Sequence, residues 1–209
     1  SFSRVKETRA GSRELCTLPA MFQPDAAILG KYADLLVKFA LNGGEGAKKG
    51  EVVQINVPDV AKPLYHEMLR AVLQCGAYPK TNLLSTGTDK VFFKYASDDQ
   101  LIFFPEAYKR AEADLIDHQV SIIADTDPTE LKDVNPERLF RTMDARRKFR
   151  DWLFAKEQQG KFSWTLALYG TDAMAREAGM SIEEYWDQII KACYLDCSDP
   201  IAEKRPWTR

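Results

Sequence analysis

Short β-branched runs alternate with amphipathic helical segments along this chain, and this alternation constrains the fold more than any other feature. Residues 52–57 form one such run and residues 120–124 another. On both sides of the first run, apolar residues recur at three- and four-residue steps, as one face of a helix requires. Parallel strands need a long crossover, which is usually a helix. We therefore predict a layered helix–sheet–helix α/β domain with a largely parallel central sheet.

Local signals place the individual elements. Asp25, Asn135 and Ser181 are predicted helix caps, and Ser181 with Glu184 forms a capping box. Helices are predicted to begin at Ala27, Pro63, Glu106, Pro136 and Ile182, and the one from Pro136 to reach about Lys156. Besides the two runs above, strands are predicted at Asn82 to Ser85, at Val91 to Tyr95, and around Phe162, Trp164 and Leu166.

Composition excludes several classes of protein. With 45% hydrophobic and 29% charged residues, the 209-residue chain has enough apolar surface to fold. Its longest apolar runs fall short of the roughly 18 residues of a membrane span, and Ser1 to Arg13 lacks the apolar region of a signal peptide. A net charge of −2 argues against nucleic acid or a membrane surface as the main partner.

The cysteines indicate a compartment. Cys16, Cys75, Cys193 and Cys197 are too sparse for a disulfide framework in a chain of this length. We expect them to be thiols in a reducing cytoplasm. Cys193 continues the apolar stripe of the last helix, so packing is a better interpretation of it than metal binding.

A glycine-rich stretch at residues 43–50 resembles a phosphate-binding loop only superficially. Such a loop follows a strand and opens a helix, with backbone amides converging on the phosphate. Here the glycines follow a helix and precede a strand, and the lysines Lys48 and Lys49 are not followed by Ser or Thr. We interpret the stretch as a plain helix-to-strand loop.

Two histidine positions offer little to a metal. His66-Glu67 begins like the zinc motif H-E-x-x-H, but Arg70 stands where the second histidine belongs. The chelate therefore cannot form, and an exposed helix face is the better interpretation. His118, at the start of a predicted strand, has no paired ligand nearby in the sequence.

Asp125 and Asp127 stand at the carboxyl end of a predicted strand, where α/β proteins bind ligands. The same Asp-Thr-Asp-Pro string is also an ordinary turn. Location alone is weak evidence, so the turn is the favoured interpretation, and a small-molecule site here remains an alternative.

Basic and aromatic residues interleave on the long predicted helix, a pattern that nucleic-acid-binding surfaces share. Acidic residues such as Asp144 and Asp151 interrupt the pattern, which favours a solvated face or a partner contact. The residues concerned are Arg138, Arg141, Arg146, Arg147, Lys148 and Arg150, with Phe149, Trp152 and Phe154.

Several segments, taken in order, resemble the thermophilic metalloaminopeptidases of the aminopeptidase T and aminopeptidase S group. The strongest likeness is Ala175 to Trp186. The others are Lys31 to Val37, Gly50 to Ile55, Ala61 to Leu64, Gly76-Ala77, Ile122 to Asp125, Val134 to Arg138, Leu195-Asp196 and Asp199-Pro200.

The resemblance implies a domain of a hydrolase that removes N-terminal residues from peptides. Members of that family are roughly twice this length, form homodimers, and hold two divalent metal ions of the zinc, cobalt or manganese type in their carboxyl-terminal half. Their metal ligands have no counterparts here. We therefore assign no catalytic, cofactor-binding or metal-binding residue, and expect this chain alone to be inactive.

The resemblance also suggests how the chain is divided. Residues 1–24 are predicted to be a leader or arm, 25–200 the α/β domain, and 201–209 a tail or truncated linker. The expected partners are a carboxyl-terminal catalytic domain, a second copy and peptide substrates. The alternative is a stand-alone binding or assembly module of the same fold without peptidase activity.

Overall fold

A computed structural model describes residues 22–204. Residues 1–21 and 205–209 lie outside the described residues, and with them Cys16, most of the predicted leader and the end of the predicted tail. Between these limits, no helix is long and apolar enough to cross a membrane.

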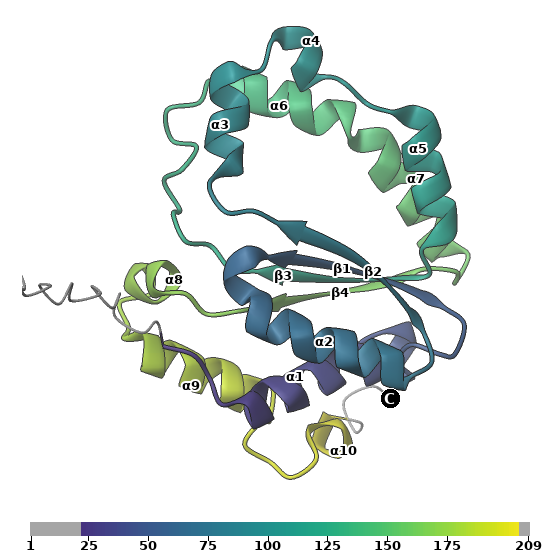
Figure 1. The fold of residues 1–209 in the computed structure, drawn as a ribbon, viewed down its shortest axis with the longest axis vertical. Helices are drawn as coiled ribbons and strands as arrows, with labels where there is room; N and C mark the ends of the chain where they lie inside the picture. Colours follow the sequence, from purple (N-terminus) through teal and green to yellow (C-terminus); the bar gives the residue numbers. More distant parts are fainter. Residues whose placement is uncertain (1–21, 205–209) are drawn as a thin grey trace, which may run out of the picture.

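Four parallel strands form the sheet at the centre of the described part, in the order β2-β1-β3-β4 (Figure 1). They are β1 (Val52–Pro58), β2 (Tyr78–Leu84), β3 (His118–Ile123) and β4 (Ser163–Leu168). β1 pairs with both β2 and β3, and β3 pairs with β4. The predicted α/β class is confirmed.

A layer of helices covers one face of the sheet (Figure 1). They are α1 (Ala26–Lys38), α2 (Lys62–Gln74) and α9 (Ile182–Ala192). The main core lies in this layer, because the β-branched residues of β1 and β3 meet the apolar stripes of these helices. Val53, Ile55, Leu64, Met68 and Trp186 are fully buried there.

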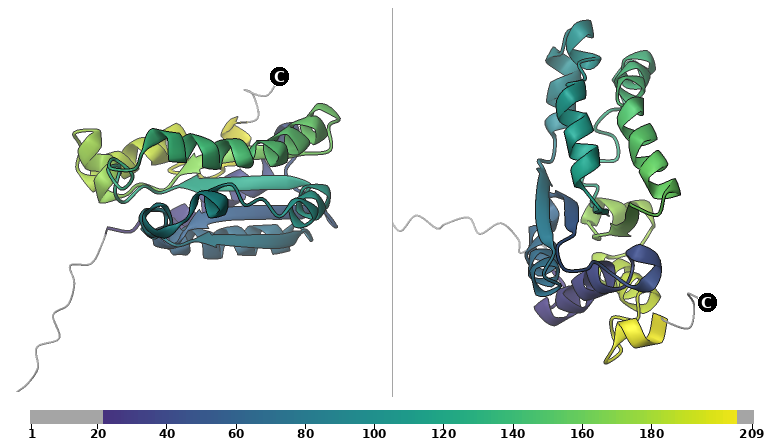
Figure 2. Two further views of the ribbon diagram at one scale, coloured as in Figure 1. Left: turned by 90° about the horizontal axis from the view of Figure 1, so that it is seen from above. Right: turned by 90° about the vertical axis from the view of Figure 1, so that its right-hand side faces the viewer.

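A second group of helices rises from the other face and is called the helical lobe (Figure 2). It contains α3 (Thr88–Tyr95), α4 (Asp98–Leu101), α5 (Glu106–Leu115), α6 (Pro136–Ala145) and α7 (Arg147–Gln158). The remaining elements are the short helices η1 (Asn42–Gly44), η2 (Asp59–Ala61), α8 (Asp172–Glu177) and α10 (Pro200–Lys204).

Caps predicted from the sequence form as expected. Asp25 accepts the amide of Ala27 at 2.7 Å at the start of α1, and Asn135 accepts the amide of Glu137 at 2.9 Å before α6. Ser181 and Glu184 make both bonds of a capping box at the start of α9.

Two predicted elements are wrong. Val91 to Tyr95 belongs to helix α3 and is not a strand, because Gly87 takes a left-handed conformation and turns the chain into the helix. The single helix predicted from Pro136 to Lys156 is broken at Arg146 into α6 and α7. α6 packs against α4 and α7 against α5, so each half follows a different partner.

Candidate functional site

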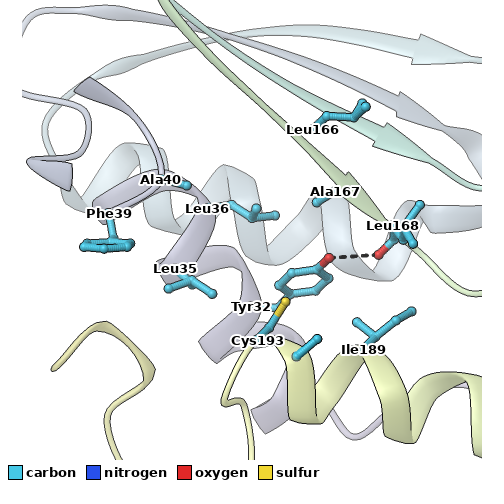
Figure 3. Close-up of a pocket in the computed structure, with 11 residues that line it drawn as sticks. Tyr32, Leu35, Leu36, Phe39, Ala40, Leu166, Ala167, Leu168, Ile189 and Cys193 are labelled. Carbon is cyan, nitrogen blue, oxygen red and sulfur yellow. Dashed lines mark hydrogen bonds between the residues drawn. The ribbon is translucent and has the colours of Figure 1, made fainter. Parts of the chain in front are cut away.

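An apolar pocket of about 350 Å³ lies between α1, α9 and the edge strand β4 (Figure 3). Its walls come from elements far apart in the sequence, and none of its lining residues is charged. They are Tyr32, Leu35, Leu36, Phe39, Ala40, Leu166, Ala167, Leu168, Ile189, Ala192 and Cys193. The lining suits an apolar group.

Tyr32 lies on α1, and its phenol ring reaches the edge of the sheet in this pocket. Its hydroxyl donates to the carbonyl oxygen of Leu168 at 3.0 Å, and Cys193 lies beside its ring (Figure 3). Burial, with Cys193 as a smaller contribution, raises the pKa of Tyr32 far above its usual range. The phenol is therefore a neutral hydrogen-bond donor and does not serve as a base.

Amide and hydroxyl side chains cross the sheet face that looks toward the helical lobe. Asn56 accepts a hydrogen bond from Gln54 at 3.1 Å and donates to Ser121 at 3.2 Å. Asn82 donates to Asn56 at 3.3 Å, and Gln119 donates to Ser121 at 3.0 Å. Parallel strands are usually apolar on both faces. This network therefore marks a face that differs from an ordinary core.

Glu112 joins the helical lobe to this polar face. Its carboxylate, only 7% exposed, accepts from Lys80 at 2.5 Å and from Lys109 at 2.6 Å. Burial alone would raise the pKa of Glu112, but the hydrogen bonds from the two lysines outweigh it and hold the pKa below its usual range. Lys80 also donates to Gln54, so the ion pair and the amide network are continuous.

His118 has the partners of a catalytic triad but the surroundings of a structural residue. Its Nδ1 lies 2.8 Å from the hydroxyl of Ser163, and its Nε2 lies 2.8 Å from the carboxylate of Glu51. The Ser163 oxygen also accepts the amide of Asn42, and His118 is 5% exposed. The trio fastens the starts of β1, β3 and β4 and holds the imidazole in the interior.

The weaker sequence motifs are structural. The glycine stretch at 43–50 is a loop between α1 and β1, as predicted. In the His66 motif, Arg70 donates to Glu67 at 2.6 Å and reaches Asp34 and the carbonyl of Gly30 on α1. The residue that breaks the zinc motif therefore clamps α2 to α1.

Asp125 and Asp127, which follow β3, make different hydrogen bonds. The carbonyl of Asp125 accepts the hydroxyl of Thr171, and Asp127 accepts the amide and hydroxyl of Thr129. The Thr129 hydroxyl and amide hold the pKa of Asp127 below its usual range. Asp127 therefore serves the turn that the sequence favoured, whereas Asp125 binds Thr171, the cap of α8, through its backbone.

The basic helix pairs with acids of its own chain. Arg138 and Arg141 both contact Asp98, at 3.0 and 2.9 Å, and Lys148 contacts Glu106 at 3.0 Å. The aromatic residues make contacts too: the Trp152 ring lies at a tilt to Phe104 and under the Arg110 guanidinium, and the Phe149 ring lies under the Lys109 ammonium. These contacts bind the helices of the lobe together.

Cysteine reactivity is suppressed at two positions. Burial raises the pKa of Cys75, and at Cys197 the same effect adds to the charges of Asp196 and Glu203. A raised pKa keeps these groups as thiols at neutral pH.

Comparison with known proteins decides the family. The sequence model of the thermophilic metalloproteases (M29) matches residues 26–209. The chain belongs to the thermophilic metalloprotease (M29) family. It is 25% identical over 192 residues to aminopeptidase 2 of Geobacillus stearothermophilus, a match that covers 85% of this chain and 44% of that protein.

A solved structure shares the fold. Wild-type AmpT from Thermus thermophilus matches with a TM-score of 0.63 and 19% identity, over 79% of this chain and 42% of that one. The chain thus spans less than half the length of each of these two relatives. The family match and the shared fold confirm the resemblance found in the sequence.

The family name implies metal ions, and the residues described do not fit one. Between residues 22 and 204, no group of three or more His, Cys, Asp or Glu side chains could hold a metal ion. A metal centre needs such a group of ligands. We therefore derive no chemical step through a metal from these residues.

Proposed function

We propose that this chain is the amino-terminal α/β domain of a metal-dependent aminopeptidase that removes N-terminal residues from peptides. The observation that carries the proposal is the family match across residues 26–209. The relative of which it spans 44% is named an aminopeptidase, which supports the activity and the division into halves. Two divalent ions of the zinc, cobalt or manganese type belong to the carboxyl-terminal half, which is the proposed partner.

The remaining parts of the proposal concern assembly and location. We place the enzyme in the cytoplasm as a homodimer acting on peptides. The sparse cysteines support a reducing compartment. The polar sheet face supports a role in walling the space where a peptide would lie, because amide side chains both donate to and accept from a peptide backbone.

Hydrolysis of an aminoacyl anilide, with and without added Zn²⁺, Co²⁺ or Mn²⁺, tests the proposal. The 209-residue chain should be inactive. The natural gene product should have about twice its 23.8 kDa mass and lose its activity to a chelator. Metal-dependent hydrolysis by the 209 residues alone would contradict the assignment.

A second function is favoured by the apolar pocket between α1, α9 and β4. This pocket has no charged lining residue, as expected of a surface that binds without reacting. A stand-alone binding or assembly module would use it directly. A natural gene product near 23.8 kDa, without peptidase activity, would select this alternative.

A further inference from the structure

A second pocket, of about 200 Å³, lies at the carboxyl-terminal edge of the sheet, where β4 leads into α8 (Figure 1). Parallel α/β sheets bind ligands outside the carboxyl ends of their strands. Its walls come from the segment before α1, the start of α2, the turn after β4 and the start of α9. The apolar part of the lining consists of Phe22, Val60, Pro63 and Ile182.

The hydroxyl of Tyr169 is a polar group that the fold leaves unused at this pocket. Tyr169 is only 5% exposed, and its hydroxyl bonds to no group in the part of the chain that the structure describes. Among those residues, no side-chain oxygen is both sealed from solvent and without a partner, so this hydroxyl opens into the pocket that Tyr169 lines. Burial raises the pKa of Tyr169, and the neutral hydroxyl is therefore ready to donate.

Trp186 holds this donor in place. Its ring lies edge to face against the Tyr169 ring, with 5.0 Å between the centroids, and its Nε1 donates to the carbonyl oxygen of Gly170 at 3.1 Å. A Cβ at Gly170 would lie 2.9 Å from the ring of Tyr185, so the chain passes here only as bare backbone. Because Trp186 is fully buried, the phenol is oriented before a ligand arrives, and binding needs little further ordering.

We propose that this pocket binds a small uncharged molecule that carries an aromatic ring and a carboxamide. A cavity of about 150 Å³ holds benzene, so this pocket suits a ring with one small substituent, and its apolar lining suits the ring. The carboxamide oxygen accepts from Tyr169, while its N–H groups donate to Gln23 or Asp172 in the polar part of the lining. The carboxylate of Asp172 disfavours an anion. The inference goes beyond the proposed function and depends on neither a metal nor a peptidase activity.

Isothermal titration calorimetry of the 209-residue chain with benzamide tests the proposal. The natural chain should bind benzamide, and Tyr169→Phe should raise the Kd at least about fivefold, because it removes only the donor. Tyr32→Phe is the matched control: Tyr32 is 2% exposed, but its hydroxyl already donates to Leu168 in the other pocket, so benzamide binding should not change. A natural chain that does not bind benzamide, or an unchanged Kd in Tyr169→Phe, would overturn the proposal.

Thermal unfolding distinguishes an unused hydroxyl from a structural one. In the absence of ligand, Tyr169→Phe breaks no hydrogen bond and should keep or raise the Tm. Tyr32→Phe removes the bond to the Leu168 carbonyl and should lower the Tm. An equal fall in Tm for both variants would show that the Tyr169 hydroxyl already has a partner, which would refute its role as a donor to a ligand.

A ligand series tests the chemical class without any variant. Ethylbenzene keeps the ring but has no acceptor, and benzoate has acceptors together with a negative charge. Benzamide should bind the natural chain at least about fivefold more tightly than either molecule. Equal binding of ethylbenzene would mean that only the apolar lining recognises the ligand, and tighter binding of benzoate would mean that the pocket selects an anion. Either result would contradict a carboxamide site.

Discussion

At the scale of single residues, Gly46 is a position where the fold leaves no room for a side chain. Its φ is +73°, and a Cβ there would lie 2.3 Å from the carbonyl oxygen of Lys38. Gly46→Ala should lower the free energy of unfolding by at least about 2 kcal/mol, from left-handed strain and the clash together. Urea denaturation measures it. Gly43→Ala is the control, because Gly43 has a similar φ of +63° but open space around it. An equal loss in both variants would remove the clash from the explanation.

Among the ion-paired carboxylates of residues 22–204, Glu112 is the least exposed, at 7%. Glu112→Gln leaves Lys80 and Lys109 without their carboxylate, and should lower the free energy of unfolding by about 2 kcal/mol at pH 7. Glu106→Gln is the control, because Glu106 pairs with Lys148 at the surface, where an ion pair contributes little. A Glu112→Gln variant as stable as the control would show that the buried pair makes no net contribution.

The Glu112 carboxylate also makes the free energy of unfolding depend on pH. Because the folded pKa of Glu112 is held below its unfolded value, its contribution is complete above the unfolded pKa of about 4.3 and is lost as the pH falls through the folded pKa. The difference in urea midpoint between the natural chain and Glu112→Gln should therefore shrink as the pH falls from 6 to 3. A constant difference across this range would mean that hydrogen bonding, not ionisation, is responsible.

These residues also show where sequence reasoning stops. The loop around Gly46 was predictable because glycines between a helix and a strand are a local signal. Glu112 and Lys80 are 32 positions apart, and His118 meets Glu51 and Ser163 across 67 and 45 positions. Only the crossovers of the fold bring such partners together, so no spacing in the sequence announces them.

At the scale of elements, α9 should depend measurably on its cap. Ser181 accepts the Glu184 amide at 3.2 Å, and its own amide donates to the Glu184 carboxylate at 2.9 Å. Ser181→Ala should lower the free energy of unfolding, measured by heat or urea, by about 1 kcal/mol. Ser181→Thr should keep the hydroxyl that accepts the Glu184 amide, and with it most of the stability. If alanine and threonine behave alike, the capping hydroxyl does not contribute.

Elements with local signals were predicted well, and those set by tertiary packing were not. The caps at Asp25, Asn135 and Ser181 formed because each bond closes within three residues. Val91 to Tyr95 has strand-forming residues, yet the left-handed Gly87 turns the chain into a helix there, since β propensity largely reflects context. The break at Arg146 carries neither glycine nor proline, so the sequence contains no signal for it.

At the scale of the whole molecule, the sequence indicates the class of fold but not its surfaces. Alternating strands and helices predict a parallel sheet because a parallel pair needs a crossover. The order β2-β1-β3-β4, and hence which strands are edges, depends on the direction of each crossover. The apolar pocket beside β4 and the network of amide and hydroxyl side chains on the sheet face both depend on that strand order. They could therefore be found only in the folded chain.

The helical lobe should open more easily than the layer beneath the sheet. Neither α3 nor α7 has a buried residue, and α6 buries only Thr142, whereas α2 buries a full apolar stripe. The ion pairs of the lobe are largely exposed and add little. Since opening free energy follows buried apolar contact, hydrogen exchange should show amide protection at least about tenfold lower in α7 than in α2. The two helices have 12 and 13 residues, so length does not bias the comparison. Equal amide protection in α7 and α2 would mean that the lobe and the sheet unfold as one unit, joined by the ion pair between Glu112 and Lys80.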